Sequence, residues 1–280
     1  MKKKKIIVLS IAATIVLALL VWTIWGNTAL EVNTYTVSGG GVPSAFDGYR
    51  IAQISDLHNA QFGKNNEKLL SLLRETKPDM IAITGDLIDS RNTDVDTALH
   101  FVKEAVKIAP CYYVTGNHEA RVTEYFELQQ GLAALGMDVL DDEQMLLERE
   151  GEAISVIGLN DPSFQMGYDP AQLVDSRLRN MTDRADYTVL LSHRPELFDV
   201  YVENGIDLAL TGHAHGGQFR LPFVGGLFAP DQGLLPEYDA GRYTEGNTNM
   251  IVSRGIGNSA FPLRFNNRPE IVLIELQISQ

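Results

Sequence analysis

The sequence has a single cysteine, and its basic residues are fewer than its acidic ones. Cys111 is the only cysteine among 280 residues, which excludes a disulfide within the chain. The 23 lysines and arginines stand against 36 aspartates and glutamates, giving a formal net charge of −13. A surface of this sign offers no electrostatic footprint for nucleic acid, so we predict that the protein binds none.

Charged residues are also absent from residues 6–25, directly after a lysine cluster at residues 2–5. At about 1.5 Å per helical residue this run spans about 30 Å, the thickness of a hydrocarbon core. A cleaved signal peptide is the alternative, but its apolar region normally has only about 7–15 residues and precedes an Ala-x-Ala-like site. Residues 27–29 read Asn-Thr-Ala, a poor cleavage signal, and no cysteine for lipidation lies near them. We therefore predict an uncleaved anchor.

The anchor divides the chain into three predicted parts. Residues 1–27 hold the cytoplasmic lysines and a transmembrane helix, residues 28–48 form a juxtamembrane segment, and residues 49–280 form one large domain. Lysines before a span remain in the cytoplasm by the positive-inside rule, so the domain is expected outside the cytoplasm, on a single-pass cell-membrane protein. The oligomeric state has no signal in the sequence.

Strand-like and helix-like patterns alternate in the first half of the domain. Residues 49–55, 79–84 and 111–115 read as buried strands, and residues 95–106 place apolar side chains on one helical face. This alternation predicts parallel βαβ units.

The second half contains a predicted hairpin and four further strands. The hairpin joins residues 145–149 to residues 153–158, and the two buried strands after it each end in a histidine. The last two strands have no helix between them and are expected to complete a second sheet. The four strands cover residues 187–192, 208–211, 249–253 and 270–277.

Five short polar motifs, holding five of the six histidines, follow the predicted strands. They are Asp56-x-His58, Gly85-Asp86-x-x-Asp89, Gly116-Asn117-His118-Glu119, Ser192-His193 and Gly212-His213-x-His215. Side chains at the carboxyl ends of neighbouring strands converge on one crevice, where nitrogen and oxygen ligands hold divalent metals. Asp86, which follows a glycine that permits a sharp turn, is the best candidate to bridge two ions. The seven predicted ligands are Asp56, His58, Asp86, Asn117, His193, His213 and His215.

The ordered series of motifs resembles the calcineurin-like metallophosphoesterase superfamily, whose series is D-x-H, G-D-x-x-D, G-N-H-[DE], H and G-H-x-H. The resemblance is to its membrane-anchored bacterial branch, which includes UDP-2,3-diacylglucosamine hydrolase-like phosphoesterases. It implies an α/β fold, a four-layer α/β/β/α sandwich of two mixed sheets flanked by helices, here with an N-terminal transmembrane helix.

The resemblance also implies a role for each site residue. One metal is bound by Asp56, His58 and His215. The other is bound by Asn117, His193 and His213, and Asp86 bridges the two. His118 faces the substrate without binding metal and donates a proton to the leaving group. Asp89 orients His118, and its charge is expected to raise the pKa of that imidazole.

Two bridged cations lower the pKa of a shared water from about 15.7 toward about 7, which supplies hydroxide at neutral pH. We therefore predict a hydrolase that cleaves a phosphodiester or a pyrophosphate, with a UDP-2,3-diacylglucosamine-like lipid among the candidate substrates. Mixed Asp, Asn and His ligands without cysteine favour Mn²⁺, with Fe or Zn²⁺ as alternatives.

Other functions stay open at this point. The domain is alternatively a membrane-tethered metal-binding scaffold without turnover, or a phosphodiesterase acting on nucleotides or cell-envelope substrates. Retention of His118 and all seven ligands argues against the scaffold. A two-metal hydrolase of amides or lactams would show an H-x-H-x-D-H motif, which is absent.

Several residues beside the motifs have two interpretations. Glu119 receives only a supporting role, and Arg194 either contacts phosphate or forms a surface ion pair. Arg254 and Arg264 are interpreted as residues whose ion pairs support the fold and not the chemistry. Residues 218–238 are either a loop folded over the core or an apolar lip that accepts acyl chains or meets the bilayer. The apolar residues of this segment are Leu221, Phe223, Val224, Leu227, Phe228, Leu234 and Leu235.

Overall fold

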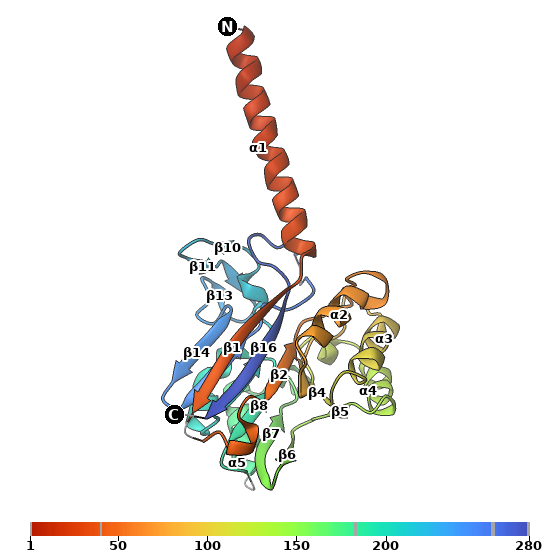
Figure 1. The fold of residues 1–280 in the computed structure, drawn as a ribbon, viewed down its shortest axis with the longest axis vertical. Coiled ribbons are helices and arrows are strands. Elements are labelled where there is room, and N and C mark those ends of the chain that lie inside the picture. The colour runs from red at the N-terminus through yellow and green to blue at the C-terminus, as the bar shows by residue number, and fades with distance from the viewer. Residues whose placement is uncertain (1, 40, 182–183, 259–260, 279–280) are drawn as a thin grey trace.

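The computed structural model describes residues 2–39, 41–181, 184–258 and 261–278. Its first element, α1 (Lys2–Thr28), projects away from the rest of the chain as a single long helix (Figure 1). Residues 3–28 are long and apolar enough to cross a membrane, a property that signal sequences share, and none of their apolar stretch is buried against the domain.

The first sheet has six strands in the order β1-β16-β2-β3-β4-β5. Its strands β2, β3, β4 and β5 are parallel, β16 runs antiparallel to β2, and β1 runs parallel to β16 at the edge. The predicted juxtamembrane segment thus contributes a strand to this sheet. The bounds are β1 Glu31–Gly39, β2 Arg50–Ile54, β3 Met80–Thr84, β4 Cys111–Val114, β5 Asp138–Val139 and β16 Glu270–Ile278.

The position of β16 corrects one prediction. We expected residues 270–277 to complete the second sheet because no helix separates them from the strand at residues 249–253. They lie instead in the first sheet, between β1 and β2. A strand that enters antiparallel to its neighbour needs no crossover helix, so the missing helix carried no information about which sheet it joins.

The second sheet has the order β14-β15-β9-β8-β7-β6. The four central strands are parallel, whereas β14 and β6 are antiparallel edges, and β6 and β7 form the predicted hairpin. The bounds are β6 Glu143–Arg149, β7 Glu152–Gly158, β8 Thr188–Leu191, β9 Leu208–Thr211, β14 Gly241–Glu245 and β15 Thr248–Val252.

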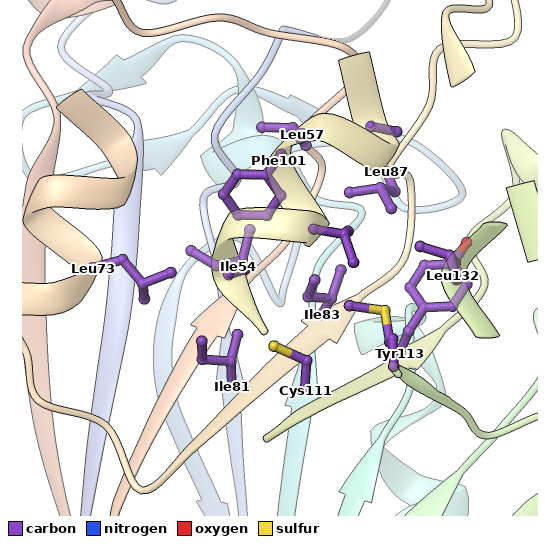
Figure 2. Packing of buried hydrophobic residues seen from close by; sticks show 14 of the residues in the cluster. Ile54, Leu57, Leu73, Ile81, Ile83, Leu87, Phe101, Cys111, Tyr113 and Leu132 are labelled. Atoms are coloured by element: carbon purple, nitrogen blue, oxygen red, sulfur yellow. The ribbon is translucent and has the colours of Figure 1, made fainter. Parts of the chain in front are cut away.

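Helices cover the outer faces of both sheets and complete the predicted four-layer sandwich. Phe101 of α3 and Leu73 of α2 pack over Ile54, Ile81 and Cys111 of the first sheet (Figure 2). A second apolar cluster fills the space between the sheets, and a third lies between the second sheet and its helices. The helices on the first sheet are α2 (Glu67–Glu75), α3 (Val95–Ala105) and α4 (Tyr125–Ala134), and those on the second are α5 (Pro170–Asn180) and α6 (Phe198–Glu203).

Four short strands follow β9 and form two small hairpins. β10 (Arg220–Leu221) pairs with β11 (Gly225–Gly226), and β12 (Phe228–Ala229) pairs with β13 (Gly233–Leu234). These hairpins lie at the end of the domain from which α1 emerges (Figure 1).

Candidate metal centre

The predicted ligands lie on tight turns that follow the parallel strands of both sheets. Five of the seven adopt positive φ angles between 46° and 65°, a region that side-chain-bearing residues rarely occupy. Strained backbone of this kind is concentrated at functional sites. The five residues are Asp56, His58, Asp86, His213 and His215.

Two motif glycines leave room for these turns. A Cβ at Gly116 would lie 2.3 Å from Asp86 Oδ1, and a Cβ at Gly212 would lie 1.8 Å from Ser55 Oγ. Neither position tolerates a side chain, because the neighbouring group is a ligand or is hydrogen-bonded to one: Ser55 Oγ donates to Asp56 Oδ2 at 2.6 Å. The glycines of the G-N-H and G-H-x-H motifs are therefore fixed by the packing of one ligand turn on another.

The first ligand cluster contains Asp56, His58, Asp86 and His215, all buried. His215 Nε2 lies 3.3 Å from Asp56 Oδ1, and His58 Nε2 lies 3.5 Å from Asp86 Oδ2. The two Nε2 atoms also face each other at 3.2 Å. Four potential donor atoms therefore point to one small volume.

The second cluster contains Asp86, His193 and His213, with Asn117 beside them. His193 Nδ1 lies 2.8 Å from the carbonyl oxygen of Thr84, which can only accept, so Nδ1 carries the proton and Nε2 faces Asp86 Oδ2 at 3.2 Å. The end of the Asn117 amide lies 2.9 Å from His213 Nδ1. With the amide nitrogen at that position, Asn117 donates a hydrogen bond to His213 Nδ1. With the amide oxygen at that position, Asn117 would offer a ligand to a cation.

The charge balance of the clusters fits divalent cations. Burial lowers the pKa of His58 to about 3 and holds the pKa of His215 well below its usual value, so both rings are neutral. Burial acts to raise the pKa of Asp86, but the nearby His193 and His58 hold it well below its usual value. Burial acts to lower the pKa of His193, but Asp86 and its other charged neighbours raise it to about 10. Imidazoles and carboxylates without a thiolate form a donor set suited to Mn²⁺, Fe or Zn²⁺.

His118 lies at the edge of the first cluster, but it differs from our expectation. Its Nδ1 accepts the Ser90 N–H at 3.0 Å and lies 3.5 Å from Asp89 Oδ1. The Asp89 carboxylate is instead hydrogen-bonded to Arg91. Burial lowers the pKa of His118, although Asp86 and Asp89 act in the opposite direction. The expected contribution of Asp89 is therefore present, but desolvation outweighs it.

Glu119 has a larger structural role than its motif suggested. Its buried carboxylate accepts three backbone N–H groups, from Gly116 at 2.7 Å, Asp86 at 3.0 Å and Ile88 at 3.1 Å. It thereby joins the turn that carries Asp86 to the turn that carries Asn117. Burial raises the pKa of Glu119 to about 7 against the effect of these N–H groups.

Arg194 is buried behind the second cluster and forms a buried ion pair with Asp161, in addition to a pair with the exposed Asp231. Its guanidinium binds both carboxylate oxygens of Asp161, at 2.6 and 2.9 Å, and also contacts Asp231. Asp231 Oδ2 in turn lies 2.8 Å from His213 Nε2. A carboxylate on one ring nitrogen would orient the ring so that the other nitrogen, Nδ1, could bind a cation held by the second cluster. Asp231 is thus a site residue that the sequence pattern did not indicate.

A cavity of about 230 Å³ opens beside the clusters, lined among others by His118, Asn117, Arg121 and Asp231. A second cavity of about 500 Å³ shares Arg121 and Asp231 with the first. Four of the seven predicted ligands, Asp86, Asn117, His213 and His215, line the first cavity together with His118. Arg254 and Arg264 do not line it, and Arg254 forms ion pairs with Glu31 and Glu270.

Known proteins share sequence and fold with this chain. Residues 49–217 match the family described as calcineurin-like phosphoesterase. The chain is 31% identical to an uncharacterized metallophosphoesterase, YkuE of Bacillus subtilis, over 89% of this chain and 86% of that protein. It is 29% identical to the phosphodiesterase YaeI of Escherichia coli, over 81% and 82% of the two chains. The crystal structure of TT1561 from Thermus thermophilus superposes with a TM-score of 0.51 at 15% identity, covering 74% of this chain and 89% of that one.

Proposed function

This chain belongs to the calcineurin-like phosphoesterase family and is a hydrolase of phosphoesters, and on that premise we propose that it cleaves a phosphodiester or a pyrophosphate with two divalent cations. The observation that carries the proposal is the place of Asp86. Its Oδ2 lies within 3.5 Å of His58 Nε2 in one cluster and 3.2 Å of His193 Nε2 in the other. One carboxylate shared by two ligand sets is the arrangement that a two-metal hydrolase requires.

When bound, two such cations supply a hydroxide nucleophile at neutral pH and offset negative charge on the phosphoryl oxygens. The ligands we propose for one cation are Asp56, His58 and His215. For the other they are Asn117, His193 and His213, with Asp86 shared. We propose Mn²⁺ as the native ion, with Fe or Zn²⁺ as alternatives.

His118 is proposed to serve the leaving group. Its Nδ1 accepts the Ser90 N–H, so the proton of the neutral ring is on Nε2. A neutral imidazole with this tautomer donates a hydrogen bond from Nε2 to the oxygen that departs from phosphorus. Asp89 lies 3.5 Å from His118 Nδ1 and stabilises the ring if it becomes protonated during turnover.

The relatives and the chain's organisation support a proposal for the substrate class. A related protein is named a phosphodiesterase, which favours diesters over monoesters. We propose that α1 is a single-pass anchor, that the domain over residues 49–280 lies outside the cytoplasm, and that residues 28–48 join the two. Lipid-linked substrates resembling UDP-2,3-diacylglucosamine, cell-envelope phosphodiesters and nucleotides are the candidates.

The test uses the full-length protein stripped of metal and restored with Mn²⁺. Phosphomonoesters, phosphodiesters and pyrophosphates are assayed with wild type, Asp86→Asn and, as a control, Asp96→Asn, which replaces an exposed carboxylate on α3. We expect Mn²⁺-dependent diester or pyrophosphate hydrolysis that Asp86→Asn abolishes and Asp96→Asn retains. Metal binding without turnover of any phosphate ester would instead support the scaffold alternative.

A further inference from the structure

Exposed apolar side chains on the two small hairpins and on residues 261–263 form a surface that we call the foot patch. The hairpins lie at the end of the domain from which α1 emerges (Figure 1). The side chains of the foot patch are large, apolar and exposed. Phe223, at the tip of the β10–β11 hairpin, is fully exposed. The members of the foot patch are Leu221, Phe223, Val224, Phe228, Leu234, Leu235, Phe261 and Leu263.

The two segments that build the foot patch are bonded to each other. Gln218 Nε2 donates to the carbonyl oxygens of Phe261 and Leu263 at 2.8 and 2.7 Å, and the Arg220 N–H donates to the Phe265 carbonyl at 3.0 Å. The rings of Phe219 and Phe261 lie 5.2 Å apart. Residues 218–235 and 261–265 therefore form one connected surface.

The carboxyl-terminal end of α1 is hydrogen-bonded to this same surface. The Asn27 side chain donates to the Arg264 carbonyl and accepts the Arg264 N–H, both at 2.8 Å. The Arg268 guanidinium lies 4.7 Å from the centre of the Trp25 ring and donates to the Ala29 carbonyl. The end of the apolar helix is thus fixed directly beside Leu263, so a bilayer that contains α1 begins where the foot patch lies.

Backbone strain supports a function for these exposed side chains. Phe223 has a φ of 66° and Leu235 a φ of 55°, although bulky residues avoid this region. Both are exposed, so burial in the domain core does not compensate for the strain. Strained backbone clusters at functional sites such as ligand clamps and switch regions.

We propose that the foot patch docks on the lipid bilayer entered by α1 and that the metal centre acts on phosphoesters of lipids in that bilayer. The second part rests on the proposed function. The β12–β13 hairpin joins the two features: its strands present Phe228 and Leu234 on the foot patch, and its turn carries Asp231 to the metal cavity and to His213. A lipid headgroup at the bilayer surface thereby reaches the cavity without leaving the membrane.

The reaction needs no reactant besides water. The oxygen of water forms a bond to phosphorus, the bond from phosphorus to one ester oxygen breaks, and that oxygen leaves with a proton as an alcohol. The remaining product is a phosphomonoester. Docking changes only how the diester is presented, so hydrolysis of a freely soluble diester does not depend on the foot patch.

Docking is tested with the full chain in vesicles of phosphatidylcholine and phosphatidylglycerol. Cys111 is buried, so Phe223→Cys provides the accessible thiol for a fluorophore, and Phe126→Cys on α4 provides a matched exposed control. We expect brominated lipids to quench the label at position 223 and not the label at position 126. A label at 223 that remains in water overturns the proposal. So does a label that is shielded yet unquenched, because a protein surface then covers the patch.

Substrate presentation is tested by the ratio of two rates. The Phe223→Ser/Phe228→Ser double variant is compared with Phe126→Ser for hydrolysis of phosphatidylglycerol in vesicles and of soluble bis(p-nitrophenyl) phosphate. We expect the double variant to lower the lipid-to-soluble ratio by about tenfold, since burial of a phenylalanine side chain is worth at least that factor. An unchanged ratio overturns the proposal. Quenching of the label on Phe223→Cys, together with a wild type that hydrolyses neither substrate, supports docking and contradicts the proposed function.

Discussion

Glu119→Ala offers a direct test of how the metal centre is held together. The carboxylate of Glu119 accepts N–H groups from Gly116, Asp86 and Ile88, and the residue is completely buried. Alanine leaves all three donors without an acceptor, in a space that other side chains do not fill. Each buried donor left unpaired costs about 1–3 kcal/mol. Since neighbouring losses are not additive, we expect a total loss of about 3–6 kcal/mol.

That loss is a large part of the stability of a domain, which is typically about 5–15 kcal/mol. We expect urea denaturation of the full-length protein in detergent, followed by circular dichroism, to show a much lower midpoint for Glu119→Ala. Glu119→Gln should lose about half as much free energy of unfolding. Its amide oxygen still accepts hydrogen bonds, whereas its amide nitrogen faces a backbone N–H and cannot accept one. The same variants should bind Mn²⁺ about 10–100-fold more weakly, since residues that orient ligands affect affinity on this scale.

The control is Glu127→Ala, which removes an exposed carboxylate on the neighbouring helix α4. We expect it to change stability by no more than about 0.5 kcal/mol. If Glu119→Ala unfolds at the same urea concentration as Glu127→Ala, the three N–H contacts do not hold the two ligand turns, and the reasoning is refuted.

Three further predictions concern single features. Gly116→Ala places a Cβ 2.3 Å from Asp86 Oδ1 and should weaken Mn²⁺ binding at least about tenfold by calorimetry, whereas Gly39→Ala, whose Cβ meets no atom within 4 Å, should not. Chelation with EDTA should lower Tm by about 5–11 °C relative to Mn²⁺ at about a hundred times its Kd, because such binding adds about 2.7 kcal/mol; an unchanged Tm would contradict a native metal site. Burial raises the pKa of Cys111 to about 12, so iodoacetamide should modify it only in denaturant, as mass spectrometry would show.

Most of the fold could be predicted because the buried strands are apolar on both faces and end in recognisable turns. The strands at residues 79–84 and 111–115 were predicted within a residue or two of β3 and β4. The sheet that β16 joins could not be predicted from the sequence. The pairing of β16 depends on which strand still has an unpaired edge once β15 is in place. Local sequence contains no signal for that long-range pairing.

The candidate site, like the fold, could be predicted from the sequence only in part. The seven proposed ligands could be selected because each follows a strand in a short motif, and the structure brings them into two neighbouring clusters that share Asp86. Asp231 could not be found, because it is an ordinary loop residue whose contact with His213 depends on the path of the β12–β13 hairpin. The net pKa shift of His118 could not be predicted, because a motif reveals the charged neighbours of a side chain and not its burial.

The metal centre exists only where the two sheets are packed together. Asp56, Asp86 and Asn117 follow strands of the first sheet, whereas His193 and His213 follow strands of the second. Gln53 of β2 joins the sheets at this edge, since its Nε2 donates to Thr84 Oγ1 in one sheet and to the Thr211 carbonyl in the other. The distance between the two ligand sets is therefore set by the apolar core between the sheets. A cavity in that core should weaken metal binding even though no ligand is touched, which couples the stability of the sandwich to its chemistry.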